Sequence, residues 1–124
     1  MVATKDQKLD GYWKYLDQII SESRIVIDRP KGSRHPRFPE IVYPLDYGYL
    51  EGTTASDGGG IDLYLGSRGT RHLSAIILTV DTFKRDAEIK LLLGCTKEET
   101  RIAFAHLNSG GMRAFLVRRP KEEE

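Results

Sequence analysis

The sequence has little of what marks secreted and membrane-bound proteins. Among its 124 residues Cys95 is the single cysteine, so no disulfide can form within the chain, and a reducing compartment is the simplest expectation. No apolar run approaches the ~20 residues that a membrane-spanning helix needs. The opening residues, MVATKDQKLDGYWKY, also lack the apolar centre of a signal peptide. We therefore expect a cytoplasmic location.

An excess of charge of one sign is lacking as well. The 19 Lys and Arg residues nearly balance the 18 Asp and Glu residues, which gives a net charge of +1 and counts against a nucleic-acid partner. The distribution is more informative. Residues 29–37, RPKGSRHPR, hold four Lys or Arg side chains and no acid, and four aspartates follow: Asp57, Asp62, Asp81 and Asp86. A basic segment with carboxylates suits an anionic substrate bridged by a metal ion, and the alternative is a solvated loop.

Length and composition suit one domain over residues 1–124, with 40% hydrophobic residues for a core. We expect an N-terminal helix within residues 1–23, a barrel with a C-terminal helix over 24–119, and a tail over 120–124. The helix is predicted at 10–23 by an apolar stripe suited to core packing or to contacts between chains. The stripe consists of Tyr12, Tyr15, Leu16, Ile19 and Ile20.

Alternating and β-branched residues predict strands at 24–28, 60–66, 72–81 and 112–119. Bent or edge strands are expected between residues 41 and 52, where Pro44 and Gly48 interrupt β-forming residues. Thr96 and Glu99 form the capping-box pattern at the start of a helix over 96–107. Several strands with two helices predict a mainly β fold, a small barrel or curled sheet with the helices packed outside.

The stretch ASDGGGID, residues 55–62, places three glycines between two aspartates. Residues 58–60 allow a tight turn, so Asp57 and Asp62 can face one point, as carboxylates that bind Mg²⁺ do. The alternative is a polar hairpin loop. Asp81 and Asp86 repeat the five-residue spacing after a strong strand. Four converging carboxylates would repel one another unless cations lay between them, so convergence predicts a metal site.

Three tyrosines, Tyr43, Tyr47 and Tyr49, lie within the run YPLDYGY. Phenol hydroxyls can donate to phosphate oxygens or to bound water. Tyrosines in strands are also ordinary packing residues, so the pattern leaves both roles open.

Taken in order, these motifs resemble a shortened and divergent soluble inorganic pyrophosphatase of the Mg-dependent family I. That family shows a Tyr-Pro-x-x-Tyr-Gly-Tyr run, a Thr-containing spacer, and Asp-Gly-Asp-Pro-x-Asp. A strand ending in Asp follows, with another Asp five residues later. The matching stretches here are VYPLDYGYLEGTTASDGGGIDLYLG and LTVDTFKRD, and order and intervals agree over residues 25 to about 90.

The resemblance implies a five-stranded, OB-like, closed or partly closed β-barrel. It implies an inorganic diphosphatase that hydrolyses pyrophosphate or a related phosphoanhydride with Mg²⁺ as cofactor, and it allows a homo-oligomer. Metal ligands are then expected at Asp57, Asp62, Asp81 and Asp86. Catalytic roles are expected at Asp28, Tyr43, Tyr47 and Asp62. Substrate contacts are expected from Arg34, Arg37, Tyr43 and Lys90, and guanidinium forks match phosphate oxygens well.

Three departures from the family pattern bear on activity. Gly59 stands where the family has an aspartate thought to activate the attacking water, Glu88 stands where it has a lysine, and the late Tyr-Lys phosphate clamp has no clear counterpart. These departures favour a second hypothesis, a non-catalytic pyrophosphatase-like protein that binds a phosphorylated small molecule. A third is an OB-type nucleic-acid module, against which the near-neutral charge and the central carboxylates argue.

Overall fold

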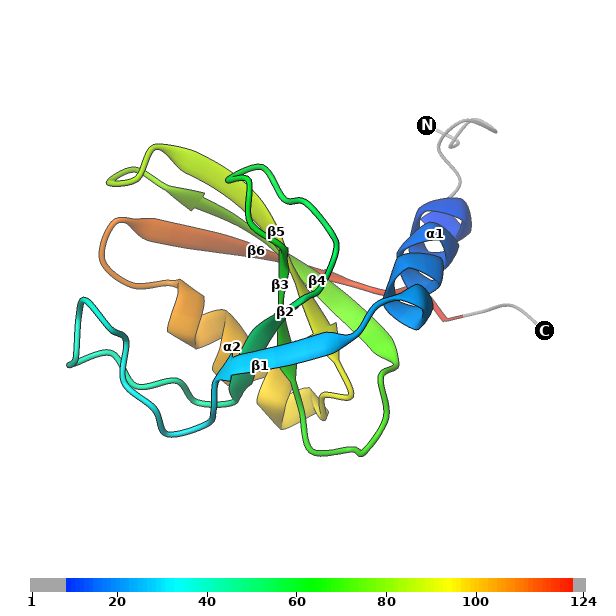
Figure 1. Cartoon of the computed structure of the whole chain (residues 1–124), viewed down its shortest axis with the longest axis horizontal. Helices are drawn as coiled ribbons and strands as arrows, with labels where there is room; N and C mark the ends of the chain where they lie inside the picture. The colour runs from blue at the N-terminus through cyan, green and yellow to red at the C-terminus, as the bar shows by residue number, and fades with distance from the viewer. Residues whose placement is uncertain (1–8, 122–124) are drawn as a thin grey trace.

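The computed structural model describes residues 9–121, apart from the side chains of residues 9 and 10. A helix comes first, followed by three strands, a hairpin of two strands, a second helix and a last strand (Figure 1). The elements are α1 Leu9–Glu22, β1 Ile25–Arg29, β2 Asp46–Leu50, β3 Ile61–Leu65, β4 Leu73–Asp81, β5 Asp86–Leu93, α2 Lys97–Leu107 and β6 Met112–Arg118. The predicted helices at 10–23 and 96–107 and the predicted strands at 24–28, 60–66, 72–81 and 112–119 are confirmed to within a residue or two. Between residues 41 and 52 only Asp46–Leu50 forms a strand, and it lies inside the sheet and not at an edge.

The strands form one six-stranded sheet in the order β1-β2-β3-β5-β4-β6. All neighbours run antiparallel except β3 and β5, which are parallel. β1 and β6 are the two edges, so the sheet is open. The mainly β fold with flanking helices is therefore confirmed, and the barrel is not a closed one.

β5 is absent from the strands predicted from the sequence, and the count of five strands is therefore wrong. Its residues DAEIKLLL alternate polar and apolar side chains from Asp86 to Leu91, which is the pattern of a strand with two different faces. The physical difference from a surface strand is that its polar side chains turn inward. Lys90 is only 4% exposed, and Leu91 beside it is fully buried.

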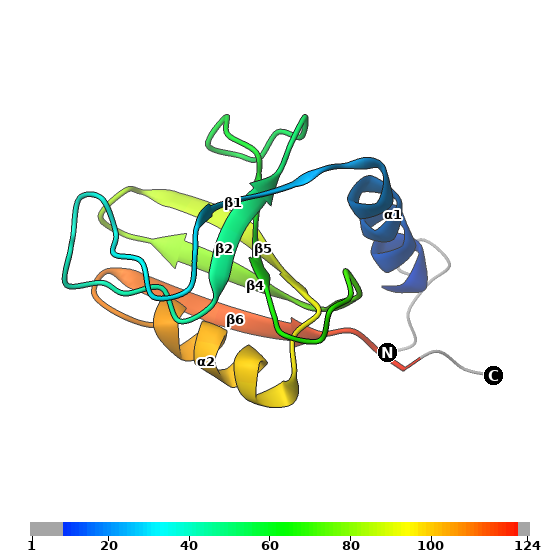
Figure 2. The ribbon, with the colours of Figure 1, turned by 60° about the horizontal axis from the view of Figure 1, so that its bottom comes forward.

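The two faces of the sheet carry two separate cores. One, here called the aliphatic face, packs against α1 and contains Leu50, Leu63, Leu73, Ile76, Leu91 and Leu93. The other, here called the tyrosine face, packs against Ala103 and Leu107 of α2 and contains Tyr43, Leu45, Tyr47, Tyr64, Ala75, Ile77 and Leu92. Figure 2 shows α2 lying along β6, well apart from α1. The polar site residues described below lie on the tyrosine face.

Helix α1 packs through a different stripe from the one predicted. Trp13, Leu16 and Ile20 are buried, whereas Tyr12 and Tyr15 are 47% and 75% exposed and Ile19 lies at 36%. Core packing of Tyr12, Tyr15 and Ile19 was therefore a wrong expectation. The helix turns its largest apolar side chain, Trp13, onto the sheet, and the spacing 13, 16, 20 is as helical as the predicted one.

Helix α2 begins with the predicted capping box. The backbone N–H of Glu99 donates to Thr96 Oγ1 at 3.1 Å, and the backbone N–H of Thr96 donates to Glu99 Oε1 at 2.9 Å. The same Glu99 carboxylate accepts from the backbone N–H of Ser67, which fixes the helix against the loop after β3. Neither α1 nor α2 is long and apolar enough to cross a membrane.

Candidate functional site

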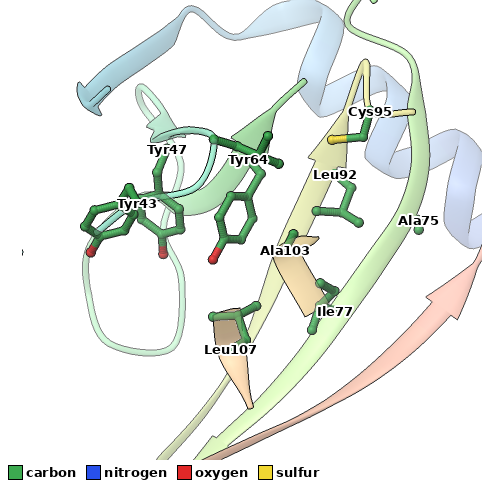
Figure 3. Close-up of a cluster of buried hydrophobic side chains, with 10 residues drawn as sticks. Tyr43, Tyr47, Tyr64, Ala75, Ile77, Leu92, Cys95, Ala103 and Leu107 are labelled. Atoms are coloured by element: carbon green, nitrogen blue, oxygen red, sulfur yellow. The ribbon is translucent and has the colours of Figure 1, made fainter. Parts of the chain in front are cut away.

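Three tyrosines stand side by side on the tyrosine face, with their hydroxyl groups pointing the same way (Figure 3). The ring centroids of Tyr43 and Tyr47 are 5.2 Å apart, and those of Tyr47 and Tyr64 are 4.9 Å apart. The Tyr64 hydroxyl lies 2.7 Å from His106 Nδ1 of α2. The packing role considered for Tyr43 and Tyr47 is therefore confirmed, because their rings lie in the core. Donation from their hydroxyls to phosphate stays a prediction.

The centre of the site is the ammonium group of Lys90. Its Nζ donates to the Tyr47 hydroxyl at 2.9 Å and to Asp62 Oδ2 at 3.1 Å. It also lies 3.4 Å from Glu88 Oε1. The Tyr47 hydroxyl in turn donates to Asp62 Oδ2 at 2.7 Å. Tyr47, Asp62, Glu88 and Lys90 are here called the Lys90 cluster.

Strand geometry explains why these side chains meet. Asp62 on β3 is directly beside Lys90 on β5 in the parallel ladder. Glu88 lies two residues before Lys90 and therefore on the same face. Burial alone would lower the pKa of Lys90, but the charges of Asp62 and Glu88 outweigh it and raise that pKa. Burial and the Asp62 charge raise the pKa of Tyr47 well above its usual value, so Lys90 is charged and Tyr47 is a neutral donor.

Asp57 approaches this cluster from the glycine turn. Its Oδ1 accepts the backbone N–H of Gly59 at 2.9 Å. That contact, and then a hydrogen bond from Glu88, lowers the pKa of Asp57. Burial, and the neighbouring Asp57, raise the pKa of Glu88 against the opposing effect of Lys90. The side chains of Asp57 and Glu88 therefore interact with each other beside Lys90.

Asp81 and Asp86 lie apart from Lys90, at the end of the β4–β5 hairpin, where they face each other in register. Asp81 Oδ1 accepts the backbone N–H groups of Phe83 and Lys84 at 2.9 and 3.1 Å, which holds the hairpin turn. Both aspartates line a surface hollow of about 430 Å³ together with Arg85. Lys90 is four positions after Asp86 on β5, which corresponds to roughly 13 Å along the strand.

The four predicted metal ligands therefore divide into two pairs, with Asp57 and Asp62 beside Lys90 and with Asp81 and Asp86 at the β4–β5 hairpin. Among residues 9–121, no three His, Cys, Asp or Glu side chains come together in a way that could hold a metal ion. At Asp62 the reason is visible, because the position between the carboxylates is taken by Lys90 Nζ. In this arrangement the residues at Asp62 do not fit a Mg²⁺ ion, which needs its oxygen ligands at about 2.1 Å.

Basic groups gather at the edge of the tyrosine face, on two segments far apart in the sequence. Figures 1 and 2 both show the loop after β1 and the β4–β5 turn at the same end of the molecule. Burial lowers the pKa of His35, and the charges of Arg29, Lys84 and Arg37 lower it further, against an opposing effect of Glu40. Arg29, His35, Arg37 and Lys84 are here called the basic rim.

The basic loop is ordered by its own hydrogen bonds. His35 Nδ1 accepts the backbone N–H groups of Arg37 and Phe38 at 3.0 and 3.2 Å, and the His35 ring stacks on Tyr43. Arg29 donates to the Tyr43 hydroxyl. This links the rim to the tyrosine row and gives the loop a defined shape.

Two other predicted residues point elsewhere. Arg34 is exposed, and its Nη1 donates to the carbonyl of Pro39 at 2.8 Å, across the base of the loop. Asp28 is exposed and sits where the β1–β2 register shifts between Ile27 and Arg29. Their roles in binding and catalysis remain predictions.

Comparison with known proteins gives a fold and no family. No protein-family model and no curated protein matches the chain. A crystal structure of an inorganic pyrophosphatase from Neisseria gonorrhoeae superposes with a TM-score of 0.61 at 14% identity, over 77% of this chain and 81% of that one. This chain has a pyrophosphatase-like fold.

Within that fold, three contributors to the site were missed by the sequence reasoning: Tyr64, Lys84 and His106. Tyr64 carries a usable signal, because it lies two residues after Asp62 and therefore on the same face of β3. Lys84 and His106 carry none, since only the pairing of the whole sheet brings the hairpin turn and α2 to the tyrosine row.

Proposed function

We propose that this chain is a pyrophosphatase-like binding protein that takes a phosphorylated small molecule at the basic rim. The observation that carries the proposal is that the loop after β1, which contains Arg37, and the β4–β5 turn, which contains Lys84, lie at the same end of the molecule (Figures 1 and 2). Arg37 and Lys84 are 47 residues apart in sequence. Cations brought together from separate segments repel one another, and an anion between them removes that cost. Phosphate is the anion that Arg and Lys recognise best.

The rim also has a neutral side that suits such a ligand. The Tyr43 hydroxyl accepts from Arg29, and the rings of Tyr43 and Tyr47 are in contact. Phenol hydroxyls supply short-range hydrogen bonds, whereas the rim supplies charge. The predicted contacts of Arg34, Arg37 and Tyr43 with phosphate belong to this proposal.

The test is a calorimetric titration of the protein with pyrophosphate and a panel of nucleoside diphosphates and triphosphates. Arg37→Ala and Lys84→Ala should each weaken binding about tenfold, because a charged hydrogen bond contributes about 1.5–3 kcal/mol. Higher salt should weaken binding of the wild type.

Lys97→Ala is the matched control, because Lys97 is an exposed lysine at the first position of α2 and outside the rim. An equal loss of affinity in Lys97→Ala would mean that the titration reports only overall charge. No binding to any member of the panel would reject the proposal.

Mg²⁺-dependent hydrolysis of pyrophosphate is the second candidate function. One observation favours it: Asp57, Asp62, Asp81 and Asp86 occur in the order of the pyrophosphatase motifs, within a pyrophosphatase-like fold. The missing carboxylate can be restored, because the structure gives Gly59 no positive φ, and an added Cβ would lie 3.4 Å from Asp57 Oδ1.

Release of phosphate from pyrophosphate with Mg²⁺ separates the two functions. Release by the wild type, or release that appears in Gly59→Asp and is lost in Gly59→Asp/Asp62→Ala, would support the hydrolase. Binding of pyrophosphate without release in any of the three proteins would support the binding function.

A further inference from the structure

The Lys90 ammonium has its hydrogen-bonding capacity filled from within the protein. An ammonium group has three N–H donors, and three acceptors surround Nζ: the Tyr47 hydroxyl at 2.9 Å, Asp62 Oδ2 at 3.1 Å and Glu88 Oε1 at 3.4 Å. The residue is 4% exposed. A buried lysine usually reaches for solvent, whereas this one ends among carboxylates.

The surroundings of Nζ have the character of a cation site. Two carboxyl groups on neighbouring strands, Asp62 and Glu88, point to one position, and a phenol hydroxyl completes the set. Oxygen donors of this kind suit a hard divalent ion. The ion and the ammonium exclude each other there, since both are positive and both need the same oxygens.

We propose that Lys90 is a built-in cation that takes the place of a divalent metal ion between Asp62 and Glu88, so that this cluster binds no metal in the folded protein. The inference concerns the cluster alone and holds whichever phosphorylated ligand the basic rim takes.

The sheet itself keeps the ammonium in place. Asp62 and Lys90 are paired in the parallel β3–β5 ladder, and Tyr47 pairs with Tyr64 in the next ladder. Lys90 Nζ also lies over the ring of Tyr47, 5.5 Å from its centroid, and Tyr47 itself is buried, so the ammonium is shielded from water on the tyrosine face. Removal of the amino group, in contrast, would leave the two carboxyl groups without their cation.

The experiment is a titration with Mn²⁺, followed by paramagnetic broadening of backbone amide signals in two-dimensional NMR spectra. In the wild type, the strongest broadening by Mn²⁺ should not fall on residues 61–63 and 88–91. Broadening centred on residues 81–86 that declines with distance from them would agree with the proposal, because Asp81 and Asp86 form a separate pair.

Lys90→Met keeps most of the side-chain volume and removes the charge. This variant should gain Mn²⁺-dependent broadening at residues 61–63 and 88–91, and its melting temperature should rise with Mn²⁺ concentration. Lys90→Met/Asp62→Asn should lose the gain, and Lys97→Met, a control on the exposed lysine of α2, should behave as the wild type.

Two results would overturn the proposal. One is broadening in the wild type that is strongest at residues 61–63 and 88–91, which would show that a metal ion enters beside Lys90. The other is a folded Lys90→Met protein with no new broadening at the cluster. If Lys90→Met does not fold, the wild-type titration still decides, because the proposal forbids metal there. Neither readout uses pyrophosphate, so a failure of anion binding at the rim is seen separately.

Discussion

The two faces of the sheet are built from neighbouring residues of the same strands, yet they have opposite chemistry. On β5, Leu91 enters the aliphatic face and Lys90 the tyrosine face, and both are buried. The aliphatic face is closed by Trp13, Leu16 and Ile20 of α1, side chains that carry almost no polar atoms. The tyrosine face contains hydroxyls, an ammonium and carboxylates.

Within one small sheet, the aliphatic face therefore contributes mainly to stability, and the tyrosine face carries the polar groups of the site. Burial of apolar area on the aliphatic face favours folding without any requirement for polar partners. On the tyrosine face every buried polar group needs its partner, so each contact there restricts the geometry of the others. We therefore expect substitutions on the aliphatic face to change stability alone, and substitutions on the tyrosine face to change both stability and ligand binding.

The largest effect is expected from Leu91→Ala on the aliphatic face. Leu91 is fully buried, so truncation leaves a cavity and should lower the free energy of unfolding by about 2–5 kcal/mol. Urea unfolding measures it, and pyrophosphate affinity of the folded protein should be unchanged. Leu78→Ala is the matched control, because Leu78 is 38% exposed and should cost much less. Equal losses in the two variants would contradict the assignment of the aliphatic core.

A smaller effect is expected from Tyr47→Phe, which removes one oxygen and keeps the ring. The Lys90 ammonium then loses an acceptor and Asp62 a donor, and an unsatisfied buried group costs about 1–3 kcal/mol. Urea unfolding should show the loss, and pyrophosphate titration should show weaker binding. An unchanged stability would mean that the hydroxyl contributes nothing to holding Lys90.

Asp17→Asn, at the edge of the aliphatic face, should lower the free energy of unfolding by less than Tyr47→Phe does. Arg119 donates to both carboxylate oxygens of Asp17, at 2.8 and 2.7 Å, and these hydrogen bonds lower the pKa of Asp17. The carboxylate is 43% exposed, so solvent screens the pair and a loss of about 0.2–1 kcal/mol is expected. A loss of stability as large as that of Tyr47→Phe would show that solvent does not screen the pair of Asp17 and Arg119.

The smallest effect is a pH dependence from His106. Burial, and then the charges of His35 and Lys90, lower its pKa below the ordinary value, which is near 6.5. Between the lowered pKa and 6.5 the unfolded chain binds a proton that the folded protein does not. The free energy of unfolding should therefore fall as the pH falls through that window. The contribution of the neutral His106 to stability is complete above pH 6.5.

Urea unfolding at a series of pH values between 5 and 7.5 measures this dependence. His106→Gln should reduce the slope of the free energy of unfolding against pH. His35, whose pKa is also lowered, should account for part of the slope that remains. Identical slopes in the wild type and His106→Gln would show that His106 does not contribute.

The elements of the fold were largely predictable, because each is marked locally. The capping box of Thr96 and Glu99 predicts the start of α2, and the alternation of Ile61, Leu63 and Leu65 predicts β3. The partner of each strand was not predictable, since pairing depends on contacts distant in sequence. The same limit applies to the site. The sequence predicts Asp62 as a site residue, but the ion pair of Asp62 with Lys90, 28 residues away, depends on the β3–β5 pairing.

The single parallel ladder between β3 and β5 also divides the chain into two folding units. β1, β2 and β3 pair antiparallel with their neighbours in sequence, and so do β4 and β5. Four residue pairs, from Asp62–Lys90 to Leu65–Leu93, join the two units. Local hairpins form quickly, whereas a joint that spans the whole of β4 must first close a long loop. The ladder that brings Asp62 to Lys90 is therefore expected to form after the local hairpins, and the polar cluster to be complete only when the two units have joined.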